Sequence, residues 1–187
     1  MWFGQGHTRV DGRSDGGAPT THLTAWARYA DWLTTTPLLL LDLLWGVMSS
    51  SSARGCVCYN VDIATVMALN VLMIATGWLA AFVMPRRHAW PRYVLWGLST
   101  LCMLGVFAYL AFVFGEGGRS GMFENEEEKK RYARSLPWIY ALWSAYPVVW
   151  LLSRDGLGLI GTCAEVFSYA VLDVLAKAGF GLFLLHA

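Results

Sequence analysis

A lysine and an aspartate lie one helical turn apart inside an apolar stretch near the end of the chain. Asp173 and Lys177 are spaced i, i+4, and the residues next to Lys177 are aliphatic or small. An ionisable group in a membrane helix costs at least ~2.5 kcal/mol on insertion scales, so it is usually paired or functional. A desolvated lysine can form a Schiff base with a carbonyl compound. The alternative is a structural ion pair that holds two helices together.

A second set of ionisable residues follows one face of an earlier apolar stretch. Arg28, Asp31 and Thr35 have the spacing i, i+3, i+7, which places them on one side of a helix. Asp42 lies on the same stripe, about three turns or 16 Å beyond Asp31 by helical rise. Pro37, between the two aspartates, frees a backbone carbonyl and can bend the helix. Two carboxylates separated in this way by leucines indicate two stations rather than one site.

Large aromatic rings recur at helical spacing in the apolar stretches. An aromatic stripe of this kind is more often core packing than part of a cofactor site, so by itself it leaves both interpretations open. The stripe at i, i+3, i+4 and i+7 comprises Trp143, Tyr146, Pro147 and Trp150, and Trp32 and Trp96 add rings in two other stretches.

The composition predicts that these charges are embedded in a membrane protein. Of the 187 residues, 56% are hydrophobic and 14% are charged, whereas a soluble domain has roughly 25% charged residues. The net charge of +1 gives no electrostatic reason to expect nucleic acid binding. The 10 Trp, 8 Tyr and 9 Phe suit a membrane interface or a ligand pocket. Cys56 and Cys58 form a C-x-C pair without a histidine or second cysteine pair nearby, so no metal site is predicted.

The chain contains five apolar stretches that approach the roughly 20 residues a membrane-spanning helix needs. The short links between them predict antiparallel neighbours. Residues 1–22 lack the apolar core of a signal peptide and are expected to form a polar loop, with turn-forming residues at 13–17. The link at 115–134 carries a charge run that is expected to be solvated. An all-α membrane protein follows, with transmembrane helices at about 23–48, 61–84, 92–114, 135–153 and 162–186.

The order and content of three of these stretches resemble the microbial rhodopsins, and in particular the bacteriorhodopsin-like proton pumps. Residues 28–42, with the sequence RYADWLTTTPLLLLD, resemble the third helix of that family almost residue for residue. LWSAYPVVW at 142–150 is similar to the sixth helix, and the stretch around Lys177 at 172–182 is similar to the seventh. The resemblance covers the chain from Trp26 onward and is weaker in the links at 49–62 and 115–134.

The resemblance implies that residues 23–187 form a retinal-binding bundle corresponding to helices three to seven of a seven-helix protein. Residues 1–6 resemble the end of the second helix, and the rest of 1–22 resembles the loop before the third. The first two helices of the family are then missing from this chain. The family's topology would place the loop at 115–134 on the cytoplasmic side and the loops at 1–22, 85–91 and 154–161 on the extracellular side.

The family motifs assign a role to each of the ionisable residues. Lys177 matches the lysine that carries all-trans retinal covalently, and Asp31 and Asp173 match the carboxylates that balance its charge. Arg28 matches the arginine beneath them. Asp31 also matches the primary proton acceptor, and Asp42 matches the cytoplasmic proton donor. Two further carboxylates, Asp155 and Glu165, fall where the family's proton-release groups lie.

The resemblance also implies a set of residues that enclose the retinal. Asn70 stands where bacteriorhodopsin has a buried aspartate, a difference expected to alter colour or kinetics rather than transport. The expected pocket residues are Trp32, Thr35, Thr36, Met73, Gly77, Trp96, Ser99, Met103, Trp143, Tyr146, Pro147 and Trp150, together with Lys177.

The function implied by this resemblance is a light-driven outward proton pump, which is a photoreceptor and transporter and not an enzyme. A sensory rhodopsin that signals through a partner is the main alternative, but sensors usually lack a carboxylic acid at the position of Asp42. A chloride pump would lack the acceptor Asp31. A truncated opsin fragment that binds no retinal is the third alternative. The expected partners are the lipid bilayer, protons and the two missing helices, and a homo-oligomer remains open.

Overall fold

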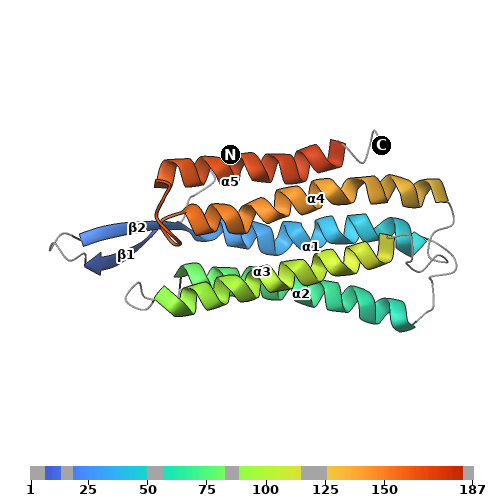
Figure 1. Ribbon diagram of the computed structural model, residues 1–187, viewed down its shortest axis with the longest axis horizontal. Helices are drawn as coiled ribbons and strands as arrows, with labels where there is room; N and C mark the ends of the chain where they lie inside the picture. Colours follow the sequence, from blue (N-terminus) through green and yellow to red (C-terminus); the bar gives the residue numbers. More distant parts are fainter. Residues whose placement is uncertain (1–6, 14–18, 50–56, 83–88, 115–125, 183–187) are drawn as a thin grey trace.

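The computed structural model describes residues 7–13, 19–49, 57–82, 89–114 and 126–182 of the chain. From Trp26 onward these residues form a bundle of long helices lying side by side (Figure 1). Successive helices run in opposite directions, and each contacts the next in the sequence. The all-α bundle predicted from the sequence is therefore confirmed. The helices are α1 (Trp26–Ser49), α2 (Val57–Phe82), α3 (Ala89–Phe114), α4 (Glu126–Leu152) and α5 (Thr162–Val174), the last continued by a π-helical turn, η1 (Leu175–Gly179).

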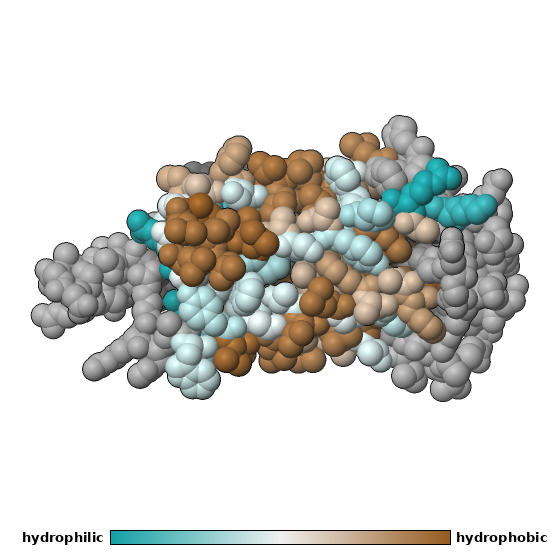
Figure 2. All heavy atoms as spheres, in the orientation of Figure 1, coloured by the Kyte–Doolittle hydropathy of each residue, from teal (hydrophilic) through white to brown (hydrophobic). Residues whose placement is uncertain are grey.

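Three of the described helices are long and apolar enough to cross a membrane by length and composition: α2, α3 and α4, over Ile63–Ala81, Trp90–Val113 and Ala133–Leu152. Helices α1 and α5 are not among these three. Charged residues lower the mean hydropathy of α1, and the α-helical part of α5 is short because it ends where η1 begins. Figure 2 shows hydrophobic side chains over the middle of the bundle on the face drawn, with the most hydrophilic ones towards its two ends. An exterior of this kind is solvated by lipid.

The N-terminal polar stretch is not the loop that the sequence predicts. It contains an antiparallel hairpin of β1 (His7–Arg13) and β2 (Pro19–Ala25), in which His7 pairs with Ala25 and Arg13 with Pro19. Figure 1 shows this hairpin projecting from one end of the bundle. The strands contain four threonines, which favour extended backbone, and the turn-forming residues lie between them.

Helix α4 begins nearer the N-terminus than the sequence predicts, at Glu126 rather than at about residue 135. Its first residues are three glutamates, and negative charge stabilises the N-terminal turn of a helix through the helix dipole. Part of the charge run expected in the 115–134 link is thus helical and extends α4 beyond its apolar span. Residues 1–6, Cys56 and residues 85–88 of the expected loop at 85–91, which also entered the sequence predictions, lie outside the described residues.

The main hydrophobic core lies in the half of the bundle away from the hairpin. Helices α1 to α4 contribute aliphatic side chains, and the second half of α1 supplies three of them. The fully buried members are Leu40, Leu43, Leu44, Val66, Val106, Leu110 and Ile139. This core leaves the middle of the bundle to larger aromatic and polar side chains, which surround the candidate site.

Candidate functional site

A partly open cavity occupies the middle of the bundle. All five helices line it, and its wall contains each pocket residue expected from the sequence, from Trp32 and Thr35 to Trp150 and Lys177. The cavity also has wall residues that the sequence reading missed. These are Tyr29, Leu39, Ile74, Ala80, Thr100, Tyr169 and Ala176. Asp173, which the sequence analysis expected as a counterion, also lies in the wall. Tyr29 and Tyr169 lie one helical turn before Trp32 and Asp173, and that spacing is the signal that would have found them.

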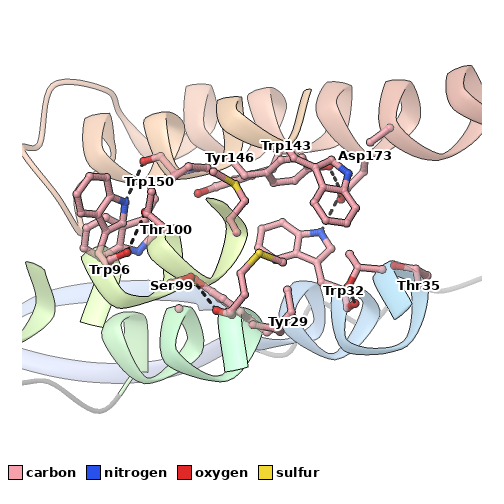
Figure 3. A pocket seen from close by; sticks show the side chains of 18 of the residues that line it. Tyr29, Trp32, Thr35, Trp96, Ser99, Thr100, Trp143, Tyr146, Trp150 and Asp173 are labelled. Carbon is pink, nitrogen blue, oxygen red and sulfur yellow. Dashed lines mark hydrogen bonds between the residues drawn. The ribbon is translucent and has the colours of Figure 1, made fainter. Parts of the chain in front are cut away.

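Aromatic rings form the walls of the cavity and hold each other in place. The rings of Trp32 and Tyr146 meet edge to face, with centroids 5.0 Å apart. The ring of Trp96 stacks on that of Trp150 at 6.2 Å, and the indole N–H of Trp96 donates to the Pro147 carbonyl at 3.1 Å. Figure 3 shows Trp96 and Trp150 at one end of the cavity and Asp173 near the other. The cavity is therefore a slot bounded by rigid rings.

Gly77 keeps one wall of this slot flat. A Cβ atom at this position would lie 3.3 Å from Ser99 Oγ and 3.7 Å from the Tyr29 ring. The Ser99 hydroxyl donates to the Met73 carbonyl at 2.7 Å, so it cannot turn aside without losing that bond. The absence of a side chain at Gly77 is thus needed for the present shape of the wall.

One cation and two carboxylates meet at the α1–α5 side of the cavity. Lys177 Nζ donates to Asp31 Oδ2, and Asp173 Oδ1 lies 4.0 Å from the same nitrogen. Asp173 Oδ1 also accepts hydrogen bonds from Trp32 Nε1 at 2.9 Å and from the Tyr146 hydroxyl at 2.8 Å. The charge of Asp173 is therefore fixed by neutral donors, whereas Asp31 contacts the lysine directly.

Lys177 lies in the π-helical turn η1, where the sequence reading assumed a continuous α-helix. The Phe180 N–H reaches back to the Leu175 carbonyl, five residues earlier. Such a turn is wider than an α-helical turn, is less stable, and occurs often at functional sites. It sets the angle at which Lys177 leaves the helix relative to Asp173.

The open side of the site is the face that α1 and α5 present outwards. The side chain of Asp31 is 46% exposed and that of Lys177 is 33% exposed. Asp42 is exposed further along the same face of α1, directly before the buried residues Leu43 and Leu44. The structure therefore brings Asp31, Asp173 and Lys177 together, and it leaves Asp42 apart from them on the stripe shared with Asp31.

A polar link joins α1 and α2 between the two aspartates of that stripe. The amide nitrogen of Asn70 donates to Thr36 Oγ1 at 2.9 Å, and the Thr36 hydroxyl donates to the Trp32 carbonyl at 2.7 Å. Asn70 is fully buried. Since Thr36 directly precedes Pro37, this link fixes α1 where the proline removes a helix hydrogen bond.

Two ion pairs lie beyond the cavity, towards the hairpin end of the bundle. Arg28 and Glu165 are 3.6 Å apart, as expected for neighbours of the site. Asp155 instead pairs with Arg92 at 2.9 Å, and both of these side chains are about nine-tenths buried. Each of the two carboxylates that the family motifs grouped together thus has its own arginine partner. Arg92 was missed, although an arginine at the start of an apolar stretch is a signal that it has a partner.

The described residues fit a long apolar molecule with a carbonyl end. The slot is lined by indole, phenol and aliphatic groups, and the amine of Lys177 opens into it. Lys177 would hold retinal covalently, with Trp32, Trp143 and Tyr146 against its chain. An antiparallel bundle with a lysine and a paired carboxylate at the end of such a slot defines the microbial rhodopsin class.

Comparison with known proteins places the chain within this class. Its residues 1–187 match the family described as bacteriorhodopsin-like protein. The chain belongs to this family and is an integral, multi-pass membrane protein.

The similar proteins include bacteriorhodopsins and archaerhodopsins and, among solved structures, a light-driven proton pump. The chain is 40% identical over 187 residues to Bacteriorhodopsin-II of Haloarcula marismortui, covering 100% of this chain and 67% of that protein. It is 37% identical over 188 residues to Archaerhodopsin-2 of Halobacterium sp. (strain aus-2), covering 100% and 65%. The light-driven proton pump LR (Mac) from Leptosphaeria maculans superposes with a TM-score of 0.74 at 30% identity, covering 96% and 70%. The chain thus spans about two thirds of the length of these curated relatives.

Proposed function

We propose that this chain binds all-trans retinal covalently at Lys177 and serves in a light-driven outward proton pump. The observation that carries the proposal is the contact of Lys177 with Asp31 and Asp173 at the end of an aromatic slot. The family membership and the pumps named among the similar proteins support it.

Retinal, when bound, would supply a light-driven change of shape that changes the direction of the N–H on the Lys177 nitrogen. Asp31 is the proposed acceptor of that proton, because its Oδ2 already contacts the lysine nitrogen. Asp173 is the proposed fixed counterion, because Trp32 and Tyr146 both donate to it and stabilise its charge. The two carboxylates thus have different surroundings and are assigned different roles.

Asp42 and the outer ion pair are the proposed ends of the proton path. Asp42 shares the exposed stripe of α1 with Asp31 and is assigned the role of donor to the Lys177 nitrogen. Arg28 and Glu165 are assigned to release on the other side, because they lie together at 3.6 Å beyond the counterions. Asp155 is assigned a smaller part in release, because Arg92 holds it in a buried pair.

Further helical segments are proposed to cover the open face of α1 and α5. Asp31 and Lys177 would otherwise meet lipid, and a charge in that position is costly. The chain spans about two thirds of the length of the curated relatives, and their additional length leaves room for further helices. Co-expressing two helices from a relative with this chain is expected to raise pigment yield. An equal yield with and without them would show that the five helices suffice.

The proposed function is tested by adding all-trans retinal to the membrane-embedded protein and recording its visible spectrum. A visible band that disappears on treatment with hydroxylamine supports a covalent pigment. Light-driven acidification outside oriented vesicles, abolished by a protonophore, supports an outward pump. A stable pigment with no pH change would favour a photosensor, and no pigment in the presence of the two added helices would contradict retinal binding.

A further inference from the structure

Tyr169 lies where the counterion group meets the outer ion pair. It is on α5, one helical turn before Asp173, and only 3% of its surface is exposed. Its ring centroid is 5.5 Å from that of Trp32 and 5.9 Å from that of Tyr146. Both of these neighbours donate to Asp173. Tyr169 therefore packs directly against the donors that fix the counterion.

The other side of the same ring carries a cation. The guanidinium carbon of Arg28 lies 4.0 Å from the centroid of the Tyr169 ring, well within the 6 Å typical of cation–π contacts. The Trp32 ring is further from it, at 6.0 Å. Arg28 is mostly buried, and it pairs with Glu165 at 3.6 Å. A buried cation over a ring face is attracted by the ring's quadrupole, so Tyr169 restricts where the guanidinium lies.

We propose that Tyr169 is a positioning residue that holds the Arg28 guanidinium beside Glu165 and thereby sets the timing of outward proton release. The proposal rests on the proposed pump function for its second half only. Arg28 is three residues from Asp31 on α1, so its charge acts on both the acceptor and Glu165. A ring that fixes Arg28 between them therefore couples the loss of a proton at Lys177 to release at the outer end.

The placement of Arg28 is tested without light, first in the parent chain and then in single variants. Guanidinium ¹⁵N and ring ¹³C-tyrosine labels are introduced, and solid-state NMR measures the dipolar coupling between them in lipid. The Arg28 signal is identified by its loss in Arg28→Lys. We expect the Arg28 signal to couple to a tyrosine ring. This coupling should persist in Tyr29→Phe and Tyr146→Phe, and it should be lost in Tyr169→Leu together with the signal of that ring. An Arg28 signal without any tyrosine coupling would overturn the proposal.

The effect on timing is tested in the retinal-loaded protein. Flash photolysis reports when the Lys177 nitrogen loses its proton, and a pH dye reports when a proton reaches the medium. Tyr169→Leu removes the ring and is expected to lengthen the delay between these events about tenfold. Tyr169→Phe keeps the ring, so its delay should equal that of the parent. A parent delay in Tyr169→Leu would overturn the role in timing.

Phe167→Leu is the matched control, because it removes a ring of α5 that is 71% exposed and faces away from the site. Its delay is expected to equal that of the parent. A general disturbance of α5 would instead lengthen the delay in both leucine variants and would also contradict the proposal. If the parent releases no protons in light, the pump function fails, whereas the NMR coupling still decides the placement of Arg28.

Discussion

Trp32 of α1 donates its indole N–H to Asp173 of α5 at 2.9 Å, across 141 positions of sequence. Tyr146 of α4 donates to the same oxygen at 2.8 Å. One carboxylate oxygen thus connects three helices around the cavity. Asp173 therefore has a structural role in addition to its charge, and it holds the rings of Trp32 and Tyr146 at the wall where retinal is proposed to lie.

Replacement of Lys177 by alanine is expected to give a colourless protein in the presence of retinal. Lys177 is the lysine that lines the cavity, and its nitrogen is the proposed attachment point. The visible spectrum after retinal addition is the measurement. Lys130→Ala, at an exposed position of α4, is the control and should keep the visible band. A normal band in Lys177→Ala would rule out the attachment site.

Asp31→Asn is expected to move the visible band to longer wavelength and to stop proton transport. The neutral amide no longer stabilises the cation at Lys177 in the ground state, and it cannot accept a proton from it. Absorption spectra and light-driven pH changes in vesicles check both effects. An unshifted variant that pumps fully would exclude Asp31 as both counterion and acceptor.

Asp42→Asn is expected to leave the colour nearly unchanged and to slow the return of the proton to the Lys177 nitrogen about a hundredfold, as for loss of a positioned acid. The slow step should become faster at lower pH and in the presence of azide, because protons then arrive from the medium. Flash photolysis between about pH 5 and 8 is the measurement. Parent-like recovery at every pH would make Asp42 a structural residue and weaken the pump relative to the sensor.

Gly77→Ala is expected to lower pigment yield and shift the visible band. The added methyl group would press on Ser99 Oγ, which its bond to Met73 holds in place, and overpacking of this kind costs ~1–3 kcal/mol. Gly97→Ala on α3 is the matched control, because a Cβ there meets nothing within 4 Å. Equal spectra and yields for the two variants would show that the wall at Gly77 can move.

Arg92→Gln is expected to lower the free energy of unfolding by about 3 kcal/mol, because it removes the guanidinium that pairs with the buried carboxylate of Asp155. The free energy of unfolding is measured by titrating the protein with a denaturing detergent and following tryptophan fluorescence. Asp155→Asn and the double variant complete a cycle, in which the double variant should lose less than the sum of the single ones. Additive losses would mean that the two residues stabilise the protein independently.

The sequence predicted the helices from the spacing of apolar residues, and its resemblance to the microbial rhodopsins implied most of the cavity wall. The positions of Asp31, Asp173 and Lys177 follow from helical periodicity and from the cost of charges among apolar residues. Tyr169 was not predicted, because a buried tyrosine has no charge to mark it and its role depends on Arg28 of another helix. The partner of Asp155 was not predicted because Arg92 lies on another helix, α3, and no local spacing connects the two residues.

The ends of the elements were predicted less well than their middles. The composition of residues 1–22 indicates polarity, but hairpin pairing between His7 and Ala25 depends on a register that composition does not report. The start of α4 at Glu126 depends on charges at a helix terminus, and a search for apolar stretches ignores them. The exposure of Asp31 depends on what covers α1, which no local pattern specifies.

The π-helical turn at Leu175–Gly179 allows the helix before it and the helix after it to be oriented independently about the helix axis. Before the turn, the helix is oriented by Tyr169 and Asp173 against the cavity wall. After it, Phe180 is oriented by the hydrophobic core. Lys177 lies at the joint between these two parts of the helix. A small rotation at this residue can therefore be absorbed within one turn, without moving either the counterion or the packed end of the helix.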